Sequence, residues 1–93
     1  MHYLYILFSK SKNKFYVGET YDVEARINAH NQHHYSNAFT KIAEDWESVL
    51  VFECGSEVEA VYLETFIKKM KSKIFIQKII NHPDILTDIL SKR

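Results

Sequence analysis

The sequence predicts an α+β fold in which a three-stranded antiparallel sheet is flanked by helices. Two aromatic and β-branched runs, residues 3–8 and 15–18, stand on either side of a polar turn, which is typical of an antiparallel hairpin. Residues 56–71 repeat apolar side chains at helical spacing. Both faces of the first strand are apolar, so we expect packing elements on both sides of the sheet.

The first strand supplies two apolar sets because successive side chains point to opposite faces. One face is expected to carry Tyr3, Tyr5 and Leu7, and the other Leu4, Ile6 and Phe8. Residues 9–14 are polar and form the predicted turn. A third strand is predicted over residues 48–54, where polar and apolar side chains alternate.

A first helix is predicted from the N-cap Asp22 to about Gln32. Its inward face is expected to hold Val23, Ile27 and His30, which are spaced i, i+4 and i+7. Arg26 lies one turn before His30, so these two side chains are neighbours on the helix.

The C-terminal third of the sequence predicts three helices. Ser56 and Glu59 form a capping-box signal for a helix that ends near Lys71, and Glu64 borders its apolar stripe. That stripe is expected to be buried and consists of Ala60, Leu63, Ile67 and Met70. A further helix is predicted over residues 73–80, and a last one over residues 83–92, with Pro83 in its first turn.

Length and composition indicate one domain over residues 1–93, because 46% hydrophobic residues suffice for a single compact core. No apolar run approaches the roughly 20 residues that span a bilayer, and the N-terminus lacks the basic and small-residue features of a signal peptide. The single cysteine, Cys54, excludes an internal disulfide and is expected to be structural. We therefore expect a cytoplasmic protein.

The charges are balanced overall and segregated along the chain. Residues 1–64 carry five Lys or Arg against ten Asp or Glu, whereas residues 65–93 carry seven against two. A zero net charge argues against avid, sequence-blind binding to nucleic acid. The lysines Lys68, Lys69, Lys71 and Lys73 nonetheless predict a local basic face, which either contacts phosphates or balances an acidic surface.

Three side chains could take part in metal-assisted cleavage of a phosphodiester. Each of them also has a purely structural interpretation. Glu64 could hold a divalent cation, or pair with Lys68 at i+4. Arg26 could bind two phosphate oxygens, or be an ordinary surface arginine. His30 could accept a proton near pH 7, or be a half-buried histidine with a backbone partner.

Tyr5 and Tyr16 could face each other across the hairpin and orient or deprotonate a water, or they could simply be core aromatics. A free phenol has a pKa of about 10, so the first role requires a nearby cation. The three histidines His30, His33 and His34 lack the companion ligands of a zinc finger.

In this order and spacing, the residues resemble the GIY-YIG nuclease domain, which occurs as the N-terminal cleavage domain of an excinuclease, in certain homing endonucleases and in small stand-alone bacterial proteins. The first motif is similar to Tyr3-Leu4-Tyr5 and the second to Tyr16-Val17-Gly18, with Tyr3 in place of the usual Gly and Val17 in place of Ile. The similarity extends over residues 2–81, and the family's helix arginine, histidine, glutamate and terminal asparagine fall on Arg26, His30, Glu64 and Asn81.

The resemblance implies a Mg²⁺- or Mn²⁺-dependent endonuclease acting on DNA. Glu64 would hold the ion, Arg26 would clamp the phosphate, and Tyr5, Tyr16 or His30 would take the proton of the attacking water. The expected DNA contacts are Arg26, Lys41, Lys68, Lys69 and Lys71, with Gly18, Thr20 and Asn81 as supporting positions. Members with known targets often carry separate DNA-binding domains, so a separate targeting protein is an expected partner.

Two alternatives remain open from the sequence. The scaffold could be a non-catalytic module that binds nucleic acid or a protein, which the zero net charge favours. More weakly, the lysine-rich helix could dock onto an acidic partner.

Overall fold

The computed structural model describes residues 1–32 and 42–93. Within these residues the predicted element types occur in the predicted order. The strands are β1 (His2–Ser9), β2 (Lys14–Thr20) and β3 (Trp46–Cys54), and the helices are α1 (Val23–Asn31), α2 (Glu57–Met70), α3 (Lys73–Asn81) and α4 (Asp84–Ser91).

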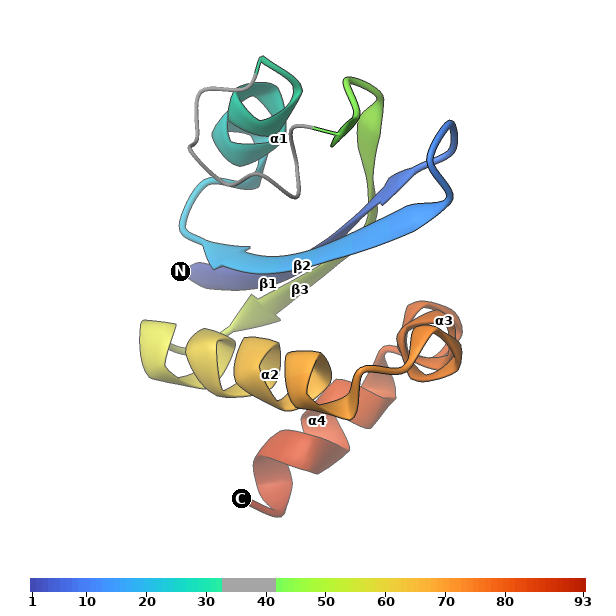
Figure 1. The fold of residues 1–93 in the computed structure, drawn as a ribbon. Helices are drawn as coiled ribbons and strands as arrows, with labels where there is room; N and C mark the ends of the chain where they lie inside the picture. The colour runs from blue at the N-terminus through green and yellow to red at the C-terminus, as the bar shows by residue number, and fades with distance from the viewer. Residues whose placement is uncertain (33–41) are drawn as a thin grey trace.

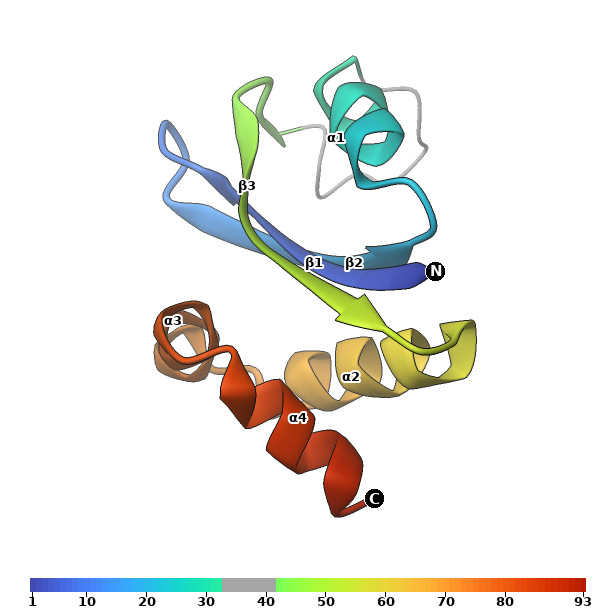
Figure 2. The same ribbon diagram turned by 180° about the vertical axis from the view of Figure 1, so that it is seen from behind.

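The three strands form one antiparallel sheet in the order β2-β1-β3. Helix α1 lies over one face of this sheet, and α2, α3 and α4 lie over the other (Figure 1). The view from behind shows the same three layers, with the C-terminal helices on the side opposite α1 (Figure 2). The α+β class predicted from the sequence is therefore confirmed.

The two faces of the sheet bury two separate clusters, as the two apolar sides of the first strand predicted. Leu4 and Ile6 belong to a large apolar cluster that includes Leu63 and Ile67 of α2. Tyr5 and Leu7 belong to a smaller cluster on the α1 side. The smaller cluster is completed by Ala43 and Trp46, with Tyr16, Val23 and Ile27 packed against it.

Strand β3 contains an irregularity that changes which face its side chains meet. Ile6 pairs with Leu50, but the next residue of β1, Leu7, pairs with Ser48, so Val49 is an extra residue. Such a bulge reverses the inward and outward alternation on its two sides. As a result Trp46 packs in the α1-side cluster while Leu50 packs in the α2-side cluster. The strand also begins two residues earlier than residue 48, where the sequence placed its start.

The helix starts follow the predicted capping residues. Asp22 Oδ1 accepts a hydrogen bond from Ala25 N at 3.1 Å, and Ser56 Oγ accepts one from Glu59 N at 3.2 Å. Glu59 Oε1 reaches back to accept a bond from Gly55 N at 2.9 Å, so the capping-box signal is confirmed.

One prediction about α2 is wrong. Met70 was expected in the buried stripe, but it is 48% exposed, whereas Ala60, Leu63 and Ile67 are buried. Met70 is the last residue of the helix, and Lys71 then adopts a left-handed backbone with φ 48° that turns the chain toward α3. No further turn of helix continues past Met70 on that side, so its side chain stays at the surface.

Two further features concern the single cysteine and the lengths of the helices. Cys54 is buried in the α2-side cluster, and this burial raises the pKa of its thiol, as expected of a structural cysteine. None of the helices in the described ranges is long and apolar enough to cross a bilayer.

Candidate active site

Tyr5 lies in the middle of β1 with its ring against the backbone of β2. Its Cα partner on β2 is Gly18, and the two residues face the α1 side of the sheet. A Cβ atom built on Gly18 would lie 2.5 Å from Tyr5 Oη and 2.6 Å from Tyr5 Cζ. Any side chain at Gly18 would therefore displace the ring, which explains why a glycine occupies this strand position.

Tyr5, Tyr16 and His30 form a compact group on the α1 side, which we call the tyrosine–histidine cluster. The Tyr5 hydroxyl is 3.1 Å from His30 Nε2, and both side chains are buried. The Tyr16 ring centre lies 4.8 Å from that of His30 and 6.3 Å from that of Tyr5. Tyr16 pairs with Leu7 across the hairpin, so the two tyrosines are diagonal neighbours rather than directly opposite.

The three members of the cluster differ in their access to solvent. Tyr5 is 1% exposed and His30 is 2% exposed, whereas Tyr16 is only half-buried on the edge strand β2. A water or a substrate approaching the cluster from outside therefore meets Tyr16 first.

Arg26 lies one helical turn before His30 on α1 and is half-buried. Burial, together with the nearby Arg26 guanidinium, lowers the pKa of His30 from its ordinary value of 6.5. The His30 imidazole is consequently neutral at pH 7 and has the form that accepts a proton.

The position of α1 is fixed at both of its ends by polar contacts. At the start, Thr20 is buried, and its Oγ1 accepts a hydrogen bond from Asp22 N at 3.1 Å. At the end, the Asn31 side chain accepts from Trp46 N at 2.8 Å and donates to Trp46 O at 2.9 Å. This two-bond clamp holds the helix that carries Arg26 and His30 against β3.

Asn31 is a positioning residue that the sequence did not reveal. An amide can donate and accept at once and so can pair with a strand backbone as another strand would. The only signal in the sequence is a polar side chain at the end of the predicted helix, and nothing there identifies Trp46 as its partner.

Glu64 lies on α2, in the layer on the opposite side of the sheet from α1. Lys68 Nζ donates to Glu64 Oε2 at 2.6 Å, which is the i+4 pairing considered as the structural alternative. The same ammonium lies 5.4 Å from the Tyr16 ring centre. Glu64 Oε2 therefore lies at most 8.0 Å from the centre of the Tyr16 ring.

The remaining predicted positions lie at helix ends or outside the described residues. Lys69 and Lys71 are exposed at the end of α2, and Asn81 is exposed at the end of α3, in the layer on the opposite side of the sheet from α1. Lys41, His33 and His34 lie outside the described residues.

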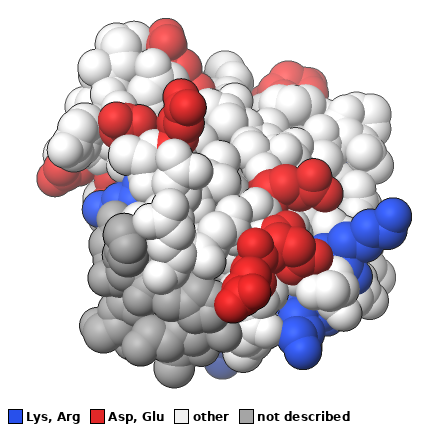
Figure 3. All heavy atoms as spheres, turned by 90° about the horizontal axis from the view of Figure 1, so that it is seen from above, with Lys and Arg blue, Asp and Glu red and all other residues white. Residues whose placement is uncertain are grey.

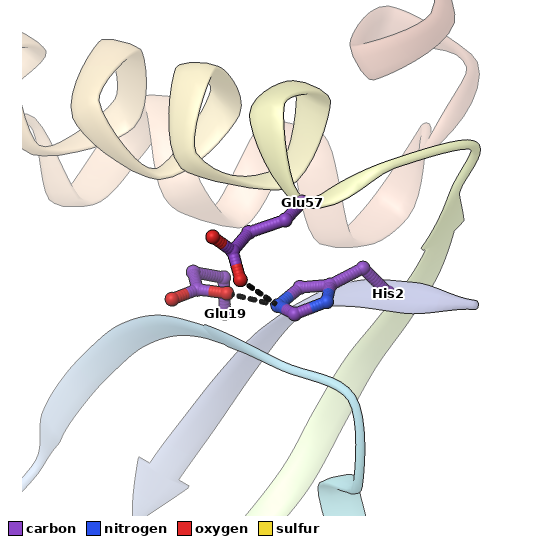
Figure 4. Close-up of side chains that lie close together, drawn as sticks. All are labelled: His2, Glu19 and Glu57. Carbon is purple, nitrogen blue, oxygen red and sulfur yellow. Dashed lines mark hydrogen bonds and ion pairs between the residues drawn. The ribbon is translucent and has the colours of Figure 1, made fainter.

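A second group of possible metal ligands lies near the C-terminal end of β2. His2 Nε2 contacts Glu19 Oε2 and lies 4.0 Å from Glu57 Oε2 (Figure 4). These ligand atoms all lie within 4.8 Å of one another, and in the described ranges no other group of three His, Cys, Asp or Glu meets this criterion. Contacts of this kind between a histidine and two carboxylates also occur without a metal ion, and the sequence did not predict the group.

The charged side chains of the described residues are mainly acidic on the face that carries α1. Seen from that side, Asp and Glu dominate the visible charged side chains, and most of the Lys and Arg lie near the rim (Figure 3).

Comparison with known proteins identifies the fold family. The family model described as GIY-YIG catalytic domain matches residues 1–79. Comparisons with curated proteins and with solved structures give no significant match. Domains of this family are generally nucleases that use divalent metals and act on DNA. Because the match covers most of the 93 residues, and the three-layer fold agrees with it, the chain belongs to the GIY-YIG catalytic domain family.

Proposed function

We propose that this protein is a metal-dependent endonuclease that hydrolyses phosphodiester bonds of DNA. The observation that carries the proposal is the tyrosine–histidine cluster, in which both motif tyrosines contact the helix that carries Arg26.

Glu64 is the proposed metal ligand, and its surroundings fit a hard cation such as Mg²⁺ or Mn²⁺. Its side chain is 22% exposed, and its Lys68 partner is still more exposed. Such a pair contributes little stability, so a cation can displace the ammonium. Mg²⁺ typically takes one or two protein carboxylates and completes its shell with waters and phosphate oxygens. When bound, the ion would supply Lewis-acid polarisation of the phosphate.

The protein's own residues have distinct parts in the proposed reaction. Arg26 binds the non-bridging oxygens and stabilises the negative charge that grows on them in the transition state. Among the three candidates for the general base, we assign the role to Tyr16, because it is the member of the cluster that solvent can reach. Tyr5 and His30 hold each other and fix the surface against which Tyr16 lies.

DNA would be held by Arg26 and by the lysines Lys41, Lys68, Lys69 and Lys71. We further propose that the protein acts in the cytoplasm as one domain over residues 1–93, and that a separate protein directs it to its DNA. The zero net charge of the chain supports the need for such a partner, since phosphate neutralisation supplies most sequence-independent affinity.

A plasmid-nicking assay with Mg²⁺ tests the proposal, using Glu64→Gln and the matched variant Glu53→Gln. Glu53 is an exposed carboxylate on β3, so its amide should leave cleavage unchanged. Loss of Glu64 should slow cleavage about a hundredfold or more, as expected when a group that stabilises transition-state charge is removed. Equal cleavage by Glu64→Gln and the parent protein would refute the assignment.

The non-catalytic alternative predicts a different outcome of the same experiment. It requires salt-sensitive DNA binding by the parent protein with no Mg²⁺-dependent nicking in any variant. A third substitution, Lys68→Met, separates the two roles of the lysine. It should tighten Mn²⁺ binding, because the competitor for the Glu64 carboxylate is gone, and should weaken DNA binding, because a cation is lost.

A further inference from the structure

A cavity of about 630 Å³ lies beside Tyr16, between the edge strand β2 and the junction of α2 and α3. Its volume falls in the range of about 300–1,000 Å³ that is common for small-ligand sites. The apolar part of its lining consists of Phe15, Val17, Ile67 and Ile76, together with the Tyr16 ring. These side chains form an aromatic and aliphatic surface without charged groups.

Four lysines line the same cavity: Lys14, Lys68, Lys71 and Lys73. No Asp or Glu is among the described residues that line it. Lys68 is paired with Glu64, which leaves the like charges of Lys14, Lys71 and Lys73 around one cavity, and an anion relieves their mutual repulsion. Helix α3 also begins here at Ser72 and has no acidic residue in its first turn, so its positive end adds to the same field.

Two of the lysines already contact aromatic rings of the lining. Lys68 Nζ lies 5.4 Å from the Tyr16 ring centre, and Lys73 Nζ lies 5.9 Å from that of Phe15. Lys73 also donates to Asn13 O at 2.9 Å, which fixes the start of α3 to the hairpin turn. The Lys14 and Lys71 ammonium groups make no hydrogen bond or ion pair with any part of the chain that the structure describes.

Aromatic rings beside lysines are the combination that binds unpaired nucleotides. Every base has a π-face that stacks on an aromatic side chain, while the cations follow the phosphates. A paired base in a duplex is already stacked and cannot enter an apolar cavity. We propose that this cavity receives an unpaired nucleotide of the DNA strand, so that the preferred substrate carries a single-stranded segment next to the bond that is cut.

This inference rests on the proposed function, because it names the form of the substrate at the same centre. It also assigns Phe15, Lys14 and Lys73 to substrate binding, which the family resemblance did not. The adjoining hollow of about 390 Å³ shares Asn13, Phe15 and Lys73 with the cavity but has no other lysine. The nucleotide that carries its phosphate among the lysines therefore belongs in the larger cavity.

Binding of two DNA probes without divalent metal tests the inference separately from cleavage. The probes are a blunt duplex and the same duplex with an unpaired overhang that contains a fluorescent adenine analogue. The overhang probe should bind about tenfold tighter, because one or more bases can stack. The fluorescence of the analogue should change on binding, since its base leaves water for an aromatic surface.

Matched variants connect this preference to the cavity. Phe15→Leu should remove most of the preference, whereas Phe66→Leu, at an aromatic that does not line the cavity, should keep it. Lys14→Ala with Lys71→Ala should reduce the salt dependence of overhang binding by about 0.7 in log–log slope for each lysine. Lys78→Ala, an exposed lysine of α3 outside the cavity, should leave the slope unchanged.

The outcomes separate the two proposals. Equal binding of the two probes, or an unchanged preference in Phe15→Leu, would overturn the cavity inference even if the plasmid were cleaved. Preferential overhang binding that depends on Phe15 and the lysines supports the cavity inference. If that preference occurred in a protein that cleaves nothing, the nuclease proposal alone would fail.

Discussion

The side chains of Leu4 and Ile6 in β1 pack on the α2 side of the sheet. Those of Tyr5 and Leu7, in the same strand, pack on the α1 side. The α2 side buries a large cluster of apolar side chains, to which three helices contribute. The α1 side buries polar groups, among them Ser9, Thr20 and His30, together with the Tyr5 hydroxyl. Burial of polar groups is unfavourable unless they are hydrogen-bonded. We therefore assign stability mainly to the α2 side and the proposed transfer of a proton to the α1 side, where Tyr16 and His30 lie.

The largest expected effect concerns the α2 side. Leu63→Ala should lower the free energy of unfolding by about 2–5 kcal/mol, because the fully buried Leu63 leaves a cavity among close-packed neighbours. Urea denaturation measures this loss. Cleavage by the fraction that remains folded should match the parent protein, and a selective loss of cleavage would contradict the division between the two faces.

The next effect concerns the α1 side. Gly18→Ala should destabilise the protein by about 1–3 kcal/mol and also reduce cleavage, because the new Cβ forces the Tyr5 ring to move. The control is Gly55→Ala, whose Cβ would come within 3.2 Å of only a carboxylate oxygen of the Glu59 side chain. That variant should change stability by about 0.5 kcal/mol or less. Thermal unfolding and the nicking assay compare the two variants. Equal effects of Gly18→Ala and Gly55→Ala would show that the contact between Gly18 and the Tyr5 ring is unimportant.

A smaller effect is expected from removing one hydroxyl. Tyr5→Phe should lower the free energy of unfolding by about 1 kcal/mol, since His30 Nε2 loses a hydrogen-bond partner in a buried place. Tyr62→Phe is the matched change on α2, where the hydroxyl has no hydrogen bond within the described residues. Chemical denaturation should show a loss only for Tyr5→Phe. A loss of the same size in Tyr62→Phe would mean that the His30 contact contributes nothing.

The smallest effect is a pH dependence on the α1 side. The pKa of His30 is lowered in the folded protein, so between that value and 6.5 the unfolded chain binds the proton more readily. The His30 contribution to stability is therefore complete above pH 6.5 and is lost as the pH falls through this window. Denaturation midpoints at about pH 5 and about pH 7.5 measure the loss. Arg26→Gln should reduce it, because one cause of the lowered pKa is gone, and an unchanged loss would exclude Arg26 as a cause.

Much of the fold could be predicted from local patterns in the sequence. The alternation in residues 3–8 predicted two buried faces, and the spacing of Val23, Ile27 and His30 predicted the inward face of α1, because both depend on neighbouring residues alone. Met70 was predicted wrongly, because its burial depends on where the helix ends against α3 rather than on periodicity.

Less of the candidate site than of the fold could be predicted from the sequence. The order of Tyr5, Tyr16, Arg26, His30 and Glu64 predicted that these five side chains would meet in one groove. The structure brings Tyr5, Tyr16 and His30 together. The Asn31 clamp and the cavity beside Tyr16 depend on contacts between segments far apart in the sequence. The catalytic roles of Arg26 and Glu64 remain predictions, which the nicking assay addresses.

The extra residue Val49 in β3 has a consequence for how the domain unfolds. Because of it, a single strand anchors Trp46 in one layer and Leu50 in the other. Detaching β3 would expose the apolar side chains of both layers to water at once. We therefore expect the two layers to unfold together. The domain should therefore lose its structure in one cooperative step.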